Sequence, residues 1–466
     1  IYKQMTVESK YLYRKQVAKL AKKHKMNEYL YLLSIIDKNV DDDYHIGFSL
    51  FKKKNTSLRV VLYILSLVLL TFITCFYLSK YFIKFRVLGF LILLIPVSQL
   101  FIQLINRLLI KVVATNPLPK LNYTKGIPDE SATMVVIPTI VSSKEKIKTM
   151  FSTLETFYLM NKSDNLYFTL LGDVKASDKE VEDYDKEISE YGEKVSTELN
   201  KKYGKDLFYF VYRKRKWNDK ESSYLGYERK RGALLQFNKI LLKEMSDSEE
   251  KKWFNVNTLH HHNLDIKYVI TLDSDTKLVL NTALNLIGAM AHPLNRPVLN
   301  KEGTKVISGY GIMQPRVSVD IEATNKSLYS QIFAGIGGFD TYSALIPDVY
   351  QDTFLEGSFV GKCIYDLKVF DQILDGVFPD NLILSHDLLE GNYLRCGYVS
   401  DIELVDDFPA KFLTDTSRHH RWARGDTQII SWLGNRVRNK KGDLIKNPIN
   451  ILGKFKILDN IVRIFY

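Results

Sequence analysis

The sequence has 466 residues, 46% of them hydrophobic, and Lys and Arg outnumber Asp and Glu by 65 to 53. This length exceeds one ordinary domain, and the apolar content is ample for a core. The net charge of +12 suits an anionic partner such as a phosphorylated substrate or an acidic lipid. The charge is spread along the chain without a basic arm, a zinc-finger signature or an RNA-binding signature, so nucleic acid is not expected as a partner.

The cysteines and histidines do not indicate a metal site or a disulfide framework. Cys75, Cys363 and Cys396 are far apart and have no CxxC spacing. Cys75 lies in an apolar run and is expected to be a small hydrophobe. The histidine run at 260–262 is expected to be a solvated loop. The chain starts at Ile1 and ends in an apolar stretch, so we interpret it as a fragment of a longer protein.

The N-terminal segment is predicted to be helical. Residues 8–36 have helical periodicity with a basic face. Such a helix either faces water or lies on a membrane surface, and the solvated alternative is the more common one. We expect residues 1–50 to form a helical cytoplasmic segment.

Two uncharged apolar runs follow, at Val60–Leu78 and Val87–Ile105. Each has the length needed to cross roughly 30 Å of hydrocarbon. We therefore expect a transmembrane hairpin within residues 51–112, with Pro96 tolerated in its second helix.

Basic residues flank this hairpin and set its expected orientation. Lys52–Lys54 and Arg59 precede the first helix, and Arg107 and Lys111 follow the second. Positive charge concentrates on the cytoplasmic side of membrane helices, so both ends are expected there. Three basic residues in the short connection weaken this expectation, namely Lys80, Lys84 and Arg86.

Beyond residue 130 the chain alternates between strand-like and helix-like stretches. Strands are expected at 132–140, 166–173 and 266–272, with helical patterns between them. This alternation predicts an α/β fold with a mostly parallel sheet. Ligands of such sheets bind beyond the carboxyl ends of the strands, where Asp173, Asp273 and Asp275 fall.

The stretch TLDSDTKL places Asp273 and Asp275 directly after one of these strands. An Asp-x-Asp pair can hold a hard divalent cation that neutralises a diphosphate, but the same pair also occurs in ordinary turns. A haloacid-dehalogenase-like phosphotransferase is a further alternative. It is disfavoured because Lys277 stands where that family usually has Thr or Val, and Thr276 is one position early.

Two further clusters are rich in chemistry. Asp387 in SHDLLEG could be a general base, or it could cap a helix that starts at Leu388. The stretch RHHRWARGDTQ at 418–428 combines an indole with several arginines. An indole can stack on a sugar face and guanidinium groups can bind phosphate, although an ordinary basic surface helix has the same composition.

The order of these clusters after membrane helices resembles that of processive family-2-like glycosyltransferases such as cellulose and hyaluronan synthases. Arg418–Trp422 fits their R-x-x-R-W motif. Longer stretches look like the glycosyltransferase region of cyclic β-1,2-glucan synthases, glycosyltransferase family 84. These are GYERKRGALLQFN (226–238), GYGIMQPR (309–316), GSFVGKCIYDL (357–367), SHDLLEG (385–391) and RHHRWARGDTQ (418–428).

The resemblance implies a GT-A-like, Rossmann-type nucleotide-sugar domain over 113–436, followed by an interfacial segment at 437–466 that leads to a truncated membrane region. It implies UDP-glucose as the donor, Mg²⁺ or Mn²⁺ as the cofactor, and inverting transfer to a growing β-glucan that is possibly linked to protein. It also implies a multi-pass protein of the bacterial inner membrane with a cytoplasmic catalytic domain. The domains that close and trim the glucan in the family are absent from this chain.

The same resemblance implies roles for single residues. Asp173 would contact the uridine, Asp387 would be the base, and Trp422 would contact the acceptor glucose. The phosphates would be bound by Arg229, Lys230, Arg231 and Arg421. Asp273 and Asp275 would serve the metal, with Asp275 as its direct ligand. Arg424, at the donor, and Asp426 would be of second rank.

The chain departs from the family pattern at a few positions. Tyr224 and Tyr227 stand where tryptophans are expected, and His386 replaces a glutamate of the cellulose-synthase pattern. Cys363 replaces a glycine in G-K-G-I-Y, where a permissive backbone is expected. Two alternatives to a β-1,2-glucan synthase stay open, which are a synthase of another polymer, like cellulose, chitin or hyaluronan, and a non-catalytic glucan-binding scaffold.

Overall fold

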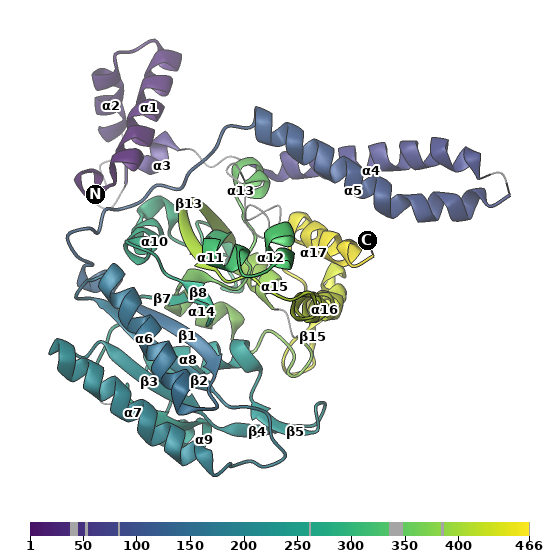
Figure 1. Ribbon diagram of the computed structural model, residues 1–466. Helices are drawn as coiled ribbons and strands as arrows, with labels where there is room; N and C mark the ends of the chain where they lie inside the picture. Colours follow the sequence, from purple (N-terminus) through teal and green to yellow (C-terminus); the bar gives the residue numbers. More distant parts are fainter. Residues whose placement is uncertain are drawn as a thin grey trace.

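A nine-stranded mixed sheet forms the centre of the molecule, in the order β6-β3-β2-β1-β7-β12-β11-β13-β8 (Figure 1). The computed structural model describes residues 1–37, 45–51, 55–82, 84–260, 262–334, 348–383 and 386–465. Within the sheet β6, β12 and β8 run antiparallel to their neighbours, and the remaining pairs are parallel. The predicted α/β class with a mostly parallel sheet is confirmed.

The strands of this sheet are β1 (Thr133–Ile140), β2 (Leu166–Asp173), β3 (Phe208–Arg213), β6 (Phe254–Asn257), β7 (Tyr268–Thr271), β8 (Thr276–Lys277), β11 (Ile312–Val319), β12 (Cys363–Asp366) and β13 (Cys396–Asp406). Three two-stranded ribbons pair β4 (Arg215–Asn218) with β5 (Ser223–Gly226), β9 (Val298–Leu299) with β10 (Val306–Ser308), and β14 (Arg436–Arg438) with β15 (Leu444–Lys446).

Helices cover both faces of the sheet, so its central strands are buried on both sides. Along β1, Val135 and Ile137 belong to one hydrophobic cluster and Met134 and Val136 to the other, as a side-chain period of two requires. The first face is covered by α6 (Lys144–Met160), α7 (Tyr184–Tyr203) and α10 (Thr282–Ala291). The second face is covered by α8 (Arg229–Leu241), α14 (Leu367–Leu374), α15 (Asp387–Tyr393) and α17 (Ile451–Arg463).

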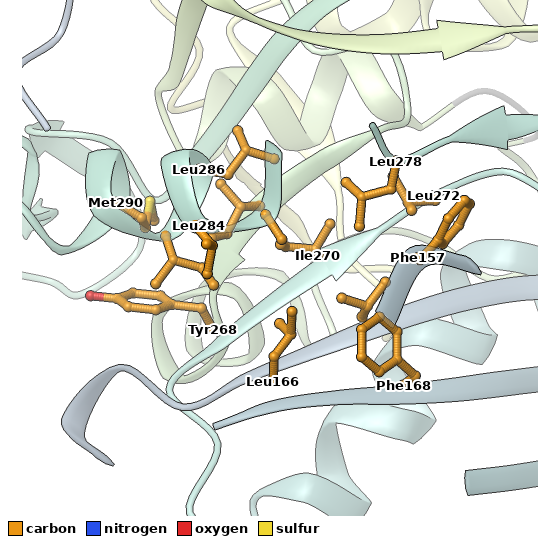
Figure 2. Close-up of a cluster of buried hydrophobic side chains, with 14 of the residues drawn as sticks. Phe157, Leu166, Phe168, Tyr268, Ile270, Leu272, Leu278, Leu284, Leu286 and Met290 are labelled. Carbon is orange, nitrogen blue, oxygen red and sulfur yellow. The ribbon is translucent and has the colours of Figure 1, made fainter. Parts of the chain in front are cut away.

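Figure 2 shows part of the first cluster. Phe157 of α6, Phe168 of β2 and Ile270 of β7 lie together, next to Leu284 and Met290 of α10. Burying such side chains contributes about 1.5–3 kcal/mol each. This packing fixes the strand ends at which the acids lie.

The short helices α9 (Asp247–Trp253), α11 (Ile321–Thr324), α12 (Leu328–Phe333) and α13 (Val349–Phe354) and the longer α16 (Phe412–Gln428) lie around this body. The segment 437–466 shares its core. Val437, Ile449, Ile457 and Ile461 join the hydrophobic cluster of the second face. Its role at a membrane surface stays a prediction.

The N-terminal segment forms α1 (Val7–His24), α2 (Glu28–Ile36) and α3 (Gly47–Leu50). Periodicity predicted one helical stretch, but Lys25 adopts a left-handed conformation and Asn27 caps the start of α2. The group docks through Tyr13, whose hydroxyl is 2.7 Å from His45 Nε2 and 3.5 Å from His292 Nε2. The lysines of α1 face outward, as expected for a solvated helix.

The two apolar runs form a hairpin of α4 (Ser57–Leu78) and α5 (Arg86–Val112), which projects from the body (Figure 1). Both helices are long and apolar enough to cross a membrane, and only 28% and 22% of their most apolar windows are buried. A core helix of a soluble protein would be mostly covered, so this exposure fits membrane association. Lys52–Lys54 lie outside the described residues, so their side of a membrane stays a prediction.

The base of the hairpin is packed against the body. Tyr63 and Ile102 contact Phe354 of α13 and Leu452 of α17 in one cluster. The Tyr63 hydroxyl donates to Asn106 Oδ1 at 2.9 Å and so joins α4 to α5. Cys75 of α4 is buried, and Cys75, Cys363 and Cys396 are free cysteines in the structure.

Candidate active site

Several acidic residues lie together at the carboxyl ends of parallel strands, a region called the sheet edge below. Asp173 is the last residue of β2, and Asp273 follows β7 by two residues. Asp406 is the last residue of β13, which runs parallel to β11. The sequence predicted Asp173 and Asp273 at this edge and missed Asp406, whose signal was the pair of acids in VDDFP.

Asp273 is held by two lysines. Lys230 Nζ, from the first turn of α8, donates to Asp273 Oδ1 at 2.5 Å. Lys362 Nζ lies 3.1 Å from Asp273 Oδ2 and 2.7 Å from Asp406 Oδ2. Burial acts to raise the pKa of Asp273, but the two ammonium groups overcome it and hold that pKa well below its usual value. Asp273 is therefore ionised and already paired.

Asp275 has a different environment. Burial raises the pKa of its carboxyl, and the charges of Asp273 and Asp406 raise it further. Asp406 in turn accepts a hydrogen bond from Thr276 Oγ1 at 2.7 Å. A carboxylate surrounded by other carboxylates lies at negative potential, which favours a cation.

A glycine loop joins these acids to Asp387. Gly361 has φ +95°, and a Cβ at this position would lie 3.0 Å from Asp387 Oδ2. The carbonyl oxygen of Gly361 accepts from Lys230 Nζ at 2.8 Å. Glycine is required here both for the positive φ and for the close approach. The loop therefore places Asp387, the predicted base, next to Lys230, the lysine that pairs with Asp273.

The neighbouring Cys363 does not need a permissive backbone. It is fully buried in β12, and it pairs with Thr271 of β7 in a regular antiparallel ladder. The positive φ that would require a glycine occurs two residues earlier, at Gly361, and not at Cys363.

Asp387 is the first residue of α15, and its side chain is 30% exposed. The structure makes His386 the N-cap of that helix, so the alternative in which Asp387 caps a helix beginning at Leu388 is wrong. Burial raises the pKa of Asp387, and the charges of His386 and Lys230 oppose this rise. A partly exposed carboxylate with a raised pKa is suited to accept a proton.

His386 and Glu390 form a buried pair behind Asp387. His386 Nδ1 lies 2.8 Å from Glu390 Oε1 and 3.6 Å from Asp387 Oδ1. Burial acts to lower the pKa of His386, but Glu390 and Asp387 raise it above its usual value. Within the described part of the chain, this is the one group of three His, Cys, Asp or Glu side chains close enough to share a metal ion. Glu390 lies in the SHDLLEG motif that the sequence predicted to hold a general base, but the sequence assigned that role to Asp387 and gave Glu390 no specific one.

Asp173 is held at the end of β2 by a buried arginine that the sequence did not indicate. Arg213 Nη1 of β3 lies 3.0 Å from Asp173 Oδ2, and the same side chain donates to the carbonyl oxygens of Tyr227 and Arg229. A Cβ on Gly226 would lie 1.9 Å from Asp173 Oδ1, so this position requires glycine. Arg213 thus connects Asp173 to the start of α8.

Of the three basic residues at the start of α8, the structure brings Lys230 alone into contact with the acids, as far as the described contacts show. Arg229 pairs with Glu221 at 2.6 Å and is exposed. Arg231 is buried, pairs with Glu228 and lies over the ring of Phe378 at 5.6 Å. Roles of Arg229 and Arg231 at a diphosphate stay predictions.

The arginine–tryptophan motif lies on α16, where Arg421, Trp422 and Arg424 are exposed or partly exposed. The described contacts of Trp422 are with His419, at 5.3 Å between ring centroids, and with Arg418, at 4.9 Å from its ring. Asp426 accepts a hydrogen bond from Asn460 of α17 at 3.5 Å. None of these described contacts joins the motif to the acids of the sheet edge, so their joint action stays a prediction.

The oxygen donors of this edge fit a hard divalent cation in part. Asp275 offers a carboxylate in a negative environment, which is the ligand type that Mg²⁺ and Mn²⁺ prefer. Asp273 has ammonium groups against both oxygens and is the less available of the two predicted ligands.

Comparison with known proteins identifies a relative. No family model matches the chain. The chain is 35% identical, over 382 residues, to the cyclic β-(1,2)-glucan synthase NdvB of Rhizobium meliloti (strain 1021), covering 81% of this chain and 13% of the synthase. The chain thus spans a small part of that protein.

Among solved structures, the galactosyltransferase LgtC in complex with donor and acceptor sugar analogues matches 57% of this chain and 72% of its own, at 12% identity and a TM-score of 0.24. The fold class stated above comes from the sheet topology and not from this superposition. The sequence match over 81% of the chain is the informative comparison. It shows that this chain is similar to a part of a cyclic β-(1,2)-glucan synthase.

Proposed function

We propose that this chain is the glycosyltransferase segment of a membrane-bound glucan synthase. It would transfer glucose from UDP-glucose to the growing end of a β-1,2-glucan, with inversion at the anomeric carbon. The observation that carries the proposal is the Gly361–Lys362 loop, which links Asp387 on one side to Asp273 and Asp406 on the other. Asp387, as the proton acceptor, and the charged sheet edge, which would bind the diphosphate, would then lie on either side of the transferred glucose.

The chemistry follows from this arrangement. The acceptor hydroxyl oxygen attacks the anomeric carbon, its proton passes to Asp387, and the bond from that carbon to the UDP oxygen breaks. General-base assistance of this kind contributes about 10²–10⁴-fold. The positive charges of His386 and Lys230 favour the ionised form of Asp387 and oppose the effect of burial, which raises its pKa overall.

The leaving UDP gains negative charge as the bond breaks, and the site must stabilise it. Lys230 and Lys362 are the cations at the sheet edge that lie within hydrogen-bonding distance of Asp273 in the described structure. A divalent cation held at Asp275 would add charge that stabilises the diphosphate. On α16, Arg421 would bind phosphate and Trp422 would stack on the acceptor glucose.

The hairpin of α4 and α5 supports a membrane location. We propose that it anchors the domain in the bacterial inner membrane with the active site on the cytoplasmic side, as part of a multi-pass protein. The fit of Phe354 and Leu452 against the base of the hairpin would hold the catalytic body at a fixed distance from the bilayer.

The test is glucan synthesis by membranes that contain the complete protein. UDP-[¹⁴C]glucose is supplied with Mg²⁺, with Mn²⁺ or with EDTA, and the linkage of the product is analysed. We expect metal-dependent incorporation into a β-1,2-linked glucan. A product with another linkage would show that the polymer is not a β-1,2-glucan, but it would leave the assignment as a transferase intact. Absence of any transfer, together with absence of UDP binding, would favour a glucan-binding scaffold and contradict the proposal.

A further inference from the structure

Lys362 occupies the position that a metal ion would need in order to bridge the acids. It immediately precedes β12, whose first residue Cys363 pairs with Thr271 of the antiparallel neighbour β7. This register sets Lys362 beside the point where the chain leaves β7 towards Asp273. Its side chain is 13% exposed, and its ammonium group lies between Asp273 Oδ2 at 3.1 Å and Asp406 Oδ2 at 2.7 Å.

The two oxygens of Asp273 are both occupied. Lys230 binds Oδ1 at 2.5 Å and Lys362 lies 3.1 Å from Oδ2. A divalent cation that bound Asp273 directly would lie next to two ammonium groups, which would repel it. Within the described part of the chain Asp275 forms no ion pair, although the charge of Lys362 lowers its pKa, and its carboxylate is therefore the more available one for a metal.

The two lysines offset half of the acidic charge at this edge. Asp273, Asp275, Asp406 and the neighbouring Asp387 carry four negative charges, and Lys230 and Lys362 carry two positive charges. The two ammonium groups therefore weaken the attraction of these acids for a divalent cation, which must also lose part of its hydration shell. A nucleoside diphosphate brings additional negative charge and new oxygen partners for both ammonium groups.

We propose that Lys362 acts as an internal cation that keeps divalent metal out of the acidic edge until the donor diphosphate binds. Its ammonium group neutralises Asp273 and Asp406 in the donor-free protein. With a diphosphate bound, Lys362 would pair with phosphate oxygens, and Asp275 would be the residue that holds the divalent cation. Metal and donor then bind together and not one before the other. This inference rests on the proposed function, and it makes Lys362 a positioning residue of the same site.

The experiment measures Mn²⁺ binding by electron paramagnetic resonance in the complete protein, in detergent, with and without UDP. Wild type is expected to bind Mn²⁺ weakly alone and much more tightly with UDP. In Lys362→Met we expect Mn²⁺ binding without UDP to tighten by about tenfold, as the loss of one competing unit charge implies. The enhancement by UDP should shrink correspondingly.

A matched control lies at the opposite end of the same two strands. Lys267 Nζ pairs with Asp366 Oδ2 at 2.7 Å, where β7 begins and β12 ends. Lys267→Met removes one lysine–aspartate pair from this ladder without touching the acids, so its Mn²⁺ affinity should equal that of wild type. Lys362→Arg keeps the charge and should also retain the strong enhancement by UDP.

Three outcomes overturn the inference, and they are distinguishable. If wild type shows no UDP-dependent Mn²⁺ binding, the proposed function fails together with the inference. If wild type shows it and Lys362→Met binds Mn²⁺ as weakly as wild type without UDP, the inference alone fails. If Lys362→Arg behaves like Lys362→Met, packing and not charge is responsible, and the inference fails as well.

Discussion

The acids at the sheet edge and the Arg421–Trp422 motif on α16 differ in exposure and in the charges around them. Asp173 and Asp273 are tied by Arg213, Lys230 and Lys362 to elements that lie far apart in the sequence. The helix α16 is also bonded to other elements, through Asp415 and Asp426, but Trp422 itself is 42% exposed. A donor of constant shape suits a site built from ion-paired side chains, whereas a growing glucan suits a more exposed one.

The largest effect is expected where the two regions must act on the same bond. Asp387→Asn keeps the shape of the side chain and removes its capacity to accept a proton. We expect glucan synthesis to fall by about 10²–10⁴-fold. UDP binding should change far less than the rate, because Lys230 keeps its direct partners Asp273 and the carbonyl oxygen of Gly361 in this variant. The measurement is initial rate with UDP-[¹⁴C]glucose next to UDP binding by calorimetry, and an unchanged rate would remove Asp387 from the mechanism.

A smaller effect is expected on the exposed helix. Trp422→Ala should lower the rate by about tenfold through the acceptor, since one aromatic stacking contact contributes roughly 0.5–1.5 kcal/mol beyond its area burial. The apparent affinity for UDP and the midpoint of thermal unfolding should stay the same because the indole is substantially exposed. Steady-state kinetics with varied acceptor, together with a thermal melt, checks this. A large loss of stability would show that α16 is structural and that the contrast between the regions is false.

The smallest effect is a shift in pH dependence. The base works when ionised, so activity should be lost as the pH falls through the pKa of Asp387, which burial raises above its usual value. His386 opposes that rise with its positive charge. In His386→Gln we therefore expect the acidic limb of kcat/KM to move to higher pH, with the rate at high pH largely retained. The pH profile of both proteins measures this, and a shift in the opposite direction would contradict the role of His386.

Much of the fold was predictable, because it is encoded locally. Buried runs ending in Asp173 and Asp273 mark parallel strands, and two long uncharged runs mark the hairpin of α4 and α5. The separation of residues 8–36 into α1 and α2 was not predicted, because the left-handed Lys25 has no sequence signal of its own. Arg213 was missed because a single charged residue in a strand has no informative period, and Asp406 was missed although it precedes a second acid, Asp407, at the end of β13.

The sequence by itself determined which acids follow which strands and that a base candidate, Asp387, exists downstream. The tertiary structure decided what surrounds them. Lys362 reaches Asp273 only because β12 runs antiparallel to β7, and Gly361 reaches Asp387 only because its φ is positive. Ion pairing depends on distance in space, and residues almost 90 positions apart acquire a short distance only when the sheet forms.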